Sequence, residues 1–138
     1  MFPDFAAQAR ARTELQGEWV AVSVHKDGTA TPVEAGTTRY VFVGNTIIHT
    51  GPTVGSAHIL YRVDAAKEPH EIDLQFIGGT VGPWTARGIY RVEDGTLSLC
   101  YGGPDASRPT DFTGRPGQGR TALVLERPHR APGTRAND

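Results

Sequence analysis

The two ends of the β-rich part of this chain constrain its fold most. The string Leu15-Gln16-Gly17-Glu18-Trp19 begins a long series of strand-like segments, and the last of these segments ends at Arg127. A Gly-x-Trp string on a first strand and an arginine on a last strand suggest that these two strands meet and close a sheet on itself. The two ends therefore predict a β-barrel.

Between these ends, short runs of apolar and polar residues alternate with a period of two and are separated by turn residues. Hairpin turns are predicted at Asp27-Gly28, Gly44-Asn45 and Glu93-Asp94-Gly95. About eight strands in sequential hairpins predict an all-β, up-and-down antiparallel barrel, whose interior has room for side chains or one small ligand. The predicted strands are 19–26, 38–43, 46–50, 57–63, 71–77, 84–92, 96–101 and 121–127.

The 138 residues predict a single domain, 1–138. A short helix at about 4–15, capped by Asp4, is expected before the barrel at about 17–127. A disordered tail is expected at 128–138. The segment 102–119 is rich in glycine and proline and predicts a long loop, a type of segment that often carries function or covers a surface.

Composition and charge exclude several classes of partner. The formal net charge is -1 and no basic stripe is visible, which argues against nucleic acid. The start of the chain lacks the basic region and the apolar region that a signal peptide has, and no run of apolar residues reaches the length of a membrane helix. We therefore expect a cytoplasmic protein with no membrane partner. Cys100 is the single cysteine, which leaves no internal disulfide.

The sequence gives little support for metal or nucleophilic chemistry. The five histidines lack metal-ligand spacing, so we expect no metal and no cofactor. Ser56 is not in a Gly-x-Ser-x-Gly string, and Cys100 lies in a strand, where a buried, unreactive thiol is expected. Glu71 and Asp73 share one strand face opposite apolar residues, which places this carboxylate pair in water rather than in an acid–base site.

The aromatic residues give the strongest functional signal. Side chains alternate between the two faces of a strand, and this alternation places the aromatic residues on the inward face together with small residues such as Ala86 and Gly88. Large rings beside small residues can leave an apolar cavity with phenol and indole donors. This pattern predicts binding of a small hydrophobic or aromatic molecule. Filling the cavity by Gly88→Leu should then abolish binding without unfolding the barrel. The predicted ligand-binding residues are Tyr40, Phe42, Tyr61, Phe76, Trp84, Tyr90 and Tyr101.

Three groups of motifs occur in order along residues 15–127. They are Leu15-Gln16-Gly17-x-Trp19; Gly88-Ile89-Tyr90-Arg91-Val92 with Asp94-Gly95-x-Leu97-x-Leu99-Cys100; and Arg108-Pro109-Thr110-Asp111-Phe112 before Pro116-Gly117-x-Gly119. Together they resemble a largely uncharacterised family of small lipocalin-like domains that is abundant in planctomycetes and found in other bacteria. The resemblance implies a lipocalin-like (calycin-type) barrel. In lipocalins the tryptophan packs at the closed barrel end beneath an arginine of the last strand, and the positions that match are Trp19 and Arg127. The resemblance therefore implies structural roles for these two residues, and a guanidinium group over an indole face is worth about 0.5–2 kcal/mol. No catalytic or binding residue follows from the resemblance.

Two other functions fit the same pattern. By fold-level analogy with lipocalin-like barrels of bacterial secondary metabolism, the pocket would fold a substrate for a cofactor-independent cyclase or isomerase reaction, including a pericyclic one. The candidate catalytic residues for that function are Tyr90, His25, His49 and Arg87. Alternatively, the barrel is solid and acts through its surface. A homodimer would then cover the face formed by Val20, Val22 and Val24, unless the N-terminal helix covers it.

The predicted long loop contains Arg108 and Asp111 on either side of Pro109-Thr110. One interpretation is structural: the two residues form a local ion pair, or they hold the loop against the barrel. The other is functional: the loop is a lid that brings a charged group to the mouth of the pocket.

Overall fold

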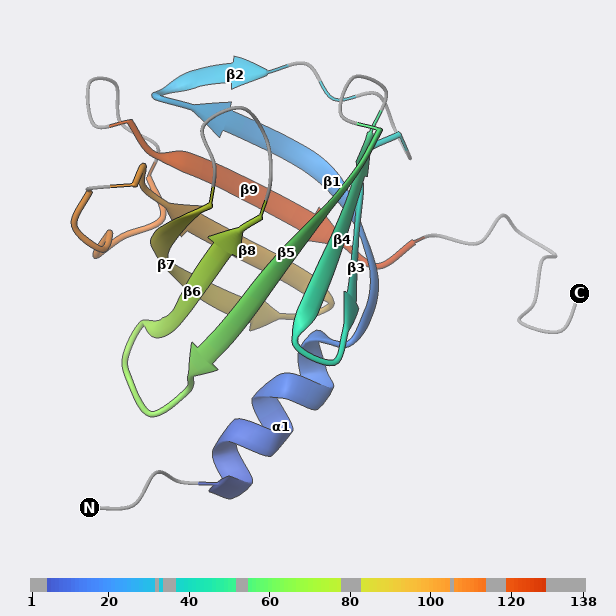
Figure 1. Cartoon of the computed structure of the whole chain (residues 1–138), viewed down its shortest axis with the longest axis vertical. Helices are drawn as coiled ribbons and strands as arrows, with labels where there is room; N and C mark the ends of the chain where they lie inside the picture. The colour runs from blue at the N-terminus through green and yellow to red at the C-terminus, as the bar shows by residue number, and fades with distance from the viewer. Residues whose placement is uncertain are drawn as a thin grey trace, which may run out of the picture.

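The computed structural model describes residues 5–31, 33, 37–51, 55–77, 83–104, 106–113 and 119–128. One helix precedes a series of antiparallel strands (Figure 1). The elements are α1 (Phe5–Leu15), β1 (Gly17–Lys26), β2 (Thr29–Thr31), β3 (Arg39–Val43), β4 (Thr46–Gly51), β5 (Gly55–Asp64), β6 (His70–Phe76), β7 (Trp84–Glu93), β8 (Thr96–Tyr101) and β9 (Thr121–Glu126).

The sheet follows chain order and closes on itself. From β3 to β9 each strand pairs with the next, β1 pairs with β3, and β1 also pairs with β9 along Val20–Lys26. The three-residue strand β2 pairs with the far end of β1. The predicted all-β, up-and-down antiparallel barrel with a short N-terminal helix is therefore confirmed. The predicted cap Asp4 and the predicted tail beyond Pro128 lie outside the described residues.

The barrel has two different ends (Figure 1). The helix α1 lies at the end where β1 begins, together with the tight turns that connect β3 to β4 and β7 to β8. We call this the closed end. The opposite end, where β1 joins β2 and where β8 leads into the long loop, is the open end. The helix of the described part is too short and too polar to span a membrane.

Alternating side chains fill the barrel as the sequence predicts. On β6 the inward residues Ile72 and Leu74 are buried, whereas Glu71 and Asp73 lie on the outer face. The core contains every aromatic residue predicted to point inward. Six hydrophobic residues packed against it are only partly buried: Val33, Phe76, Trp84 and Tyr101 at or near the open end, and Val63 and Val92 near the closed end.

A β-bulge in β1 reverses the predicted facing of its second half. Ala21 pairs with Leu125, but the next pair is Ser23 with Val124, so Val22 is an extra residue. Val24 is therefore buried (8% exposed), whereas Val22 is 47% exposed. Simple alternation from Trp19 and Ala21 predicts that Ser23 and His25 also face the interior, and this prediction is wrong. The predicted outer face of Val20, Val22 and Val24 does not exist as a continuous apolar stripe.

The long loop covers a second apolar cluster on the outer wall. Ile89 and Cys100 point away from the barrel interior yet are buried, and Pro109 from the loop is buried as well. Burial raises the pKa of the Cys100 thiol, which keeps it in the protonated, weakly nucleophilic form. This part of the loop therefore acts as a structural cover, and Cys100 is part of the packing.

Candidate functional site

The closed end is held together by the motif that begins β1. The guanidinium carbon of Arg127 lies 3.8 Å from the centroid of the Trp19 ring, as predicted. Its two Nη atoms donate hydrogen bonds to the carbonyl oxygens of Glu18 and Glu14, at 3.2 and 2.9 Å. Gly17 has a φ of +104°, and a Cβ there would lie 3.0 Å from Arg127 Nη1, so glycine is required at this position.

Neighbouring residues of the same motif complete the closure. Trp19 Nε1 donates to the carbonyl oxygen of Leu15 at 2.9 Å, which ties the end of α1 to the barrel. Gln16 pairs with the turn between β3 and β4: its Oε1 accepts from Gly44 N at 2.8 Å and its Nε2 donates to Gly44 O at 3.0 Å. The role of Gln16 was missed from the sequence, because nothing in the string identifies a partner 28 residues away.

The open half of the barrel presents two stacked pairs of rings on its inner face. Tyr40 and His49, directly opposite on β3 and β4, stack with centroids 4.3 Å apart. Phe76 and Trp84, directly opposite on β6 and β7, stack with centroids 4.4 Å apart. Tyr101 lies 5.9 Å from Phe76. These five rings, which we call the open-end rings, bring together four of the predicted ligand-binding residues and one predicted catalytic candidate.

Ionisation of the open-end rings is suppressed. Burial raises the pKa of Tyr40, with a further contribution from Tyr101, and burial raises the pKa of Tyr101 to about 12. Burial lowers the pKa of His49, and the positive charge of Lys26 lowers it further. At neutral pH the open-end rings are therefore uncharged and offer phenol and imidazole hydrogen-bonding groups.

Packing differs between the two halves of the barrel. Most inward residues of the closed half are almost completely buried, among them Trp19, Phe42, Ile47, Leu97 and Leu125. Val63 and Val92, which lie near the closed end, are partly buried. By contrast, His49, Phe76, Trp84 and Tyr101 in the open half keep part of their surface exposed. The predicted ligand-binding residues Phe42 and Tyr61 belong to the closed half, where they pack edge to face against each other. The open half is therefore the candidate site.

Tyr90 is also inward but lies in the closed half, where its ring is 5.3 Å from that of His70. It is 1% exposed, and its hydroxyl meets no hydrogen-bond partner among the described residues. Burial raises its pKa to about 12, with smaller contributions from Glu14, Tyr61 and Asp64. Tyr90 is thus far from His49 and does not form a catalytic pair with it.

We expect Tyr90→Phe to raise the free energy of unfolding by about 1 kcal/mol, because a buried hydroxyl without a partner is unfavourable. The matched control is Tyr61→Phe, since the Tyr61 hydroxyl donates to Gly44 O at 2.7 Å. The control should lower the free energy of unfolding by about 1 kcal/mol. Urea denaturation measures both. A clear loss of stability in Tyr90→Phe would show that the Tyr90 hydroxyl of the wild type has a hydrogen-bond partner in solution.

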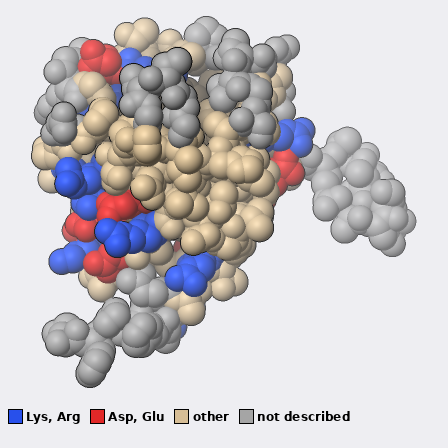
Figure 2. Space-filling view, viewed as in Figure 1, with Lys and Arg blue, Asp and Glu red and all other residues tan. Residues whose placement is uncertain are grey.

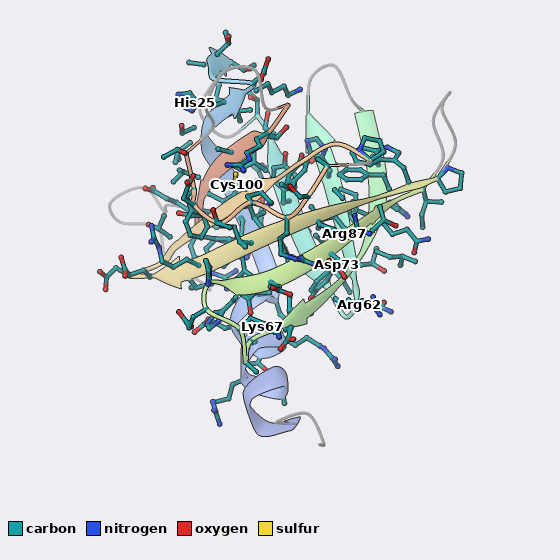
Figure 3. All side chains as sticks on the ribbon, turned by 90° about the vertical axis from the view of Figure 1, so that its left-hand side faces the viewer. His25, Arg62, Lys67, Asp73, Arg87 and Cys100 are labelled. Carbon is teal, nitrogen blue, oxygen red and sulfur yellow. The ribbon has the colours of Figure 1, made fainter. Side chains whose placement is uncertain are left out.

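The other two predicted catalytic candidates lie outside the interior. His25 follows the bulge in β1 and faces away from the core, where its Nδ1 is 3.3 Å from Ser23 Oγ. Arg87 is exposed on the outer wall of β7 (Figure 3). The four catalytic candidates therefore do not converge, and His49 is the one that lies among the open-end rings.

Arg108 holds the long loop against the barrel wall. Its Nη1 donates to the carbonyl oxygens of Gly88 and Ile72, at 2.9 and 3.3 Å. Its Nη2 is 2.9 Å from Asp73 Oδ1, and its Nε is 3.5 Å from Glu71 Oε1. This geometry matches the structural interpretation of Arg108. Asp111 instead pairs with Arg120, at 3.7 Å.

Charged side chains of both signs are interleaved on this outer wall (Figures 2 and 3). Arg62, Asp73 and Arg87 lie opposite one another on β5, β6 and β7. Two hollows share Arg62 and Asp73: one of about 400 Å³ extends toward Gln75 and Thr85, and one of about 270 Å³ extends toward Arg108. The carboxylates here are used in ion pairs with arginines, as expected of a solvated structural surface.

Gly88 does not border an empty space. A Cβ at this position would lie 2.8 Å from the carbonyl oxygen of Cys100, 2.9 Å from Tyr101 Cβ and 3.4 Å from Ile72 Cγ2. The expectation that Gly88→Leu would fill a cavity and leave the barrel intact is therefore wrong, because the space is already occupied by neighbouring strands.

In the part of the chain that the structure describes, no group of three or more His, Cys, Asp or Glu side chains is placed to hold a metal ion. Comparisons with protein-family models, curated proteins and solved structures found no match to this chain. The arguments about function therefore rest on the geometry of the barrel.

Proposed function

We propose that this protein binds a small hydrophobic or aromatic molecule in the open half of its barrel, as a lipocalin-like binding protein would. The observation that carries the proposal is that the partly exposed aromatic rings of the core lie in the open half, whereas the rings of the closed half are buried. Large aromatic rings that keep exposed surface inside an otherwise buried core are typical of a ligand site, where a few polar groups orient an apolar molecule.

The chemistry of the open-end rings supports an uncharged contact surface. Phe76 and Trp84 offer ring faces and edges against which a planar molecule can pack. Tyr40, His49 and Tyr101 supply hydrogen-bonding groups that stay neutral near pH 7. Burial of apolar area, worth roughly 25 cal/mol per Å², would provide most of the affinity.

The proposal is tested with phenylnaphthylamine, a neutral aromatic probe whose fluorescence rises in apolar surroundings. We expect wild-type protein to bind it and Trp84→Ala to bind about tenfold more weakly, since the variant loses one ring of the stacked pair. Val43→Ala is the matched control, because Val43 is an exposed apolar residue on the outer wall at the closed end. Equal affinities in the wild type and a folded Trp84→Ala variant would contradict the proposed site.

A second proposal, catalysis of a cyclisation or isomerisation, is favoured by one observation. His49, a base that stays neutral because burial lowers its pKa, stacks directly on the Tyr40 phenol at the same inner surface. A proton acceptor and a donor would thus meet one bound molecule. Native mass spectrometry of protein from its own organism separates the two functions. A bound molecule that leaves unchanged indicates a binding protein, and its conversion on the protein indicates an enzyme.

A further inference from the structure

The bulge in β1 has a consequence for the charge of the open end. Because Val22 is an extra residue, the side chains after it exchange the inner and outer faces of the sheet. Lys26 therefore lies on the same inward face of β1 as the buried Val24. Lys26 is the last residue of β1 and lies opposite Thr121 on β9, at the rim of the barrel. Its flexible stem can pack along apolar surface while the ammonium group stays in water.

This ammonium group interacts electrostatically with one of the open-end rings. The charge of Lys26 contributes to the lowered pKa of His49, whose ring stacks on Tyr40. Among the described residues Lys26 forms no ion pair. Asp27, the next residue along the chain, accepts a hydrogen bond from Gly119 N at 2.9 Å and so has a structural role in the turn.

The remaining inward positions of the open half carry no formal charge in the described part of the barrel. They include Val24, Val33, Tyr40, His49, Ala57, Phe76, Trp84, Leu99, Tyr101, Thr121 and Leu123. A neutral aromatic surface with a cation at its rim is complementary to a molecule that has an apolar body and an acidic group at one end.

We propose that the ligand of this barrel is an aromatic or other apolar molecule with an anionic group, and that Lys26 binds this group at the rim of the open end. The inference rests on the proposed binding function and assigns the chemical class of its ligand. A carboxylate, sulfonate or phosphate would serve equally, because Lys presents a compact charge without the bidentate geometry of arginine.

The test uses two probes with the same aromatic skeleton, anilinonaphthalene sulfonate and phenylnaphthylamine, which differ by the sulfonate group. We expect Lys26→Met to weaken binding of the sulfonate probe about two- to fivefold, the range of an exposed ion pair, and to leave binding of the neutral probe unchanged. Affinity of the wild type for the sulfonate probe should fall as salt is added, and this dependence should disappear in the variant.

Lys67→Met is the matched control, because Lys67 is the other of the chain's two lysines and lies exposed in the turn between β5 and β6 (Figure 3). It should change neither affinity. If Lys26→Met binds both probes as tightly as wild type does, the assignment of an anionic ligand is overturned while the binding function stands. If wild-type protein binds neither probe, the binding function itself fails, and the assignment fails with it.

Discussion

Trp19→Ala is expected to lower the free energy of unfolding by about 3–5 kcal/mol, the largest effect of any change considered for this protein. Trp19 is 1% exposed at the closed end. The substitution leaves a cavity, removes the hydrogen bond from Nε1 to Leu15 O, and removes the ring on which Arg127 lies. Chemical denaturation followed by far-ultraviolet circular dichroism measures the change.

The chain supplies its own control for this result, since Trp84 is its second tryptophan and lies partly exposed at the open end. Trp84→Ala should cost clearly less stability than Trp19→Ala. A double-mutant cycle of Trp19 with Arg127 should give a coupling energy of about 0.5–2 kcal/mol. Equal losses at the two tryptophans would contradict the view that the closed half is the well-packed part of the barrel.

Gly88→Leu is expected to destabilise the protein by about 3 kcal/mol, because even the first atom of the new side chain meets the backbone of β8. The carbonyl oxygen of Gly88 also accepts the hydrogen bond from Arg108, so a shift of β7 would disturb the attachment of the long loop. Thermal unfolding and urea denaturation measure the loss.

Gly103→Leu is the matched control for this change. A Cβ at Gly103 meets nothing within 4 Å, so the same substitution there should alter stability by no more than about 0.5 kcal/mol. A folded Gly88→Leu variant with wild-type stability would show that β7 and β8 can separate, and it would restore the original idea of an open space beside Gly88.

Much of the fold follows from local patterns in the sequence. The alternation on β6 and the turn residues Gly44 and Gly95 indicate strands and hairpins because both depend on neighbouring residues alone. The Trp19–Arg127 contact is the one that the resemblance to lipocalin-like domains implies, and the pairing of the first and last strands brings the two residues together.

The candidate site was predicted only in part. The alternation of side chains along a strand identifies inward rings such as Phe42 and Trp84, but it does not show how deeply each inward residue is buried. It cannot separate the solid closed half from the open half, because exposure depends on which segments cover each end. The outward position of His25 was missed for another reason: the bulge at Val22 is marked by no glycine, and it results from the register with β9.

The sequence alone determined eight of the strands, where hairpin turns connect them, and that the first strand meets the last, but it did not predict the short strand β2. The tertiary structure decided the partners of Gln16 and Arg108, the position of Lys26 on the inward face of β1 at the rim, and the division of the barrel into two halves. The physical reason is the distance along the chain over which each kind of interaction acts. Alternation and turn chemistry act between residues a few positions apart, whereas register, packing and ion pairs join residues that only the closed barrel brings into contact.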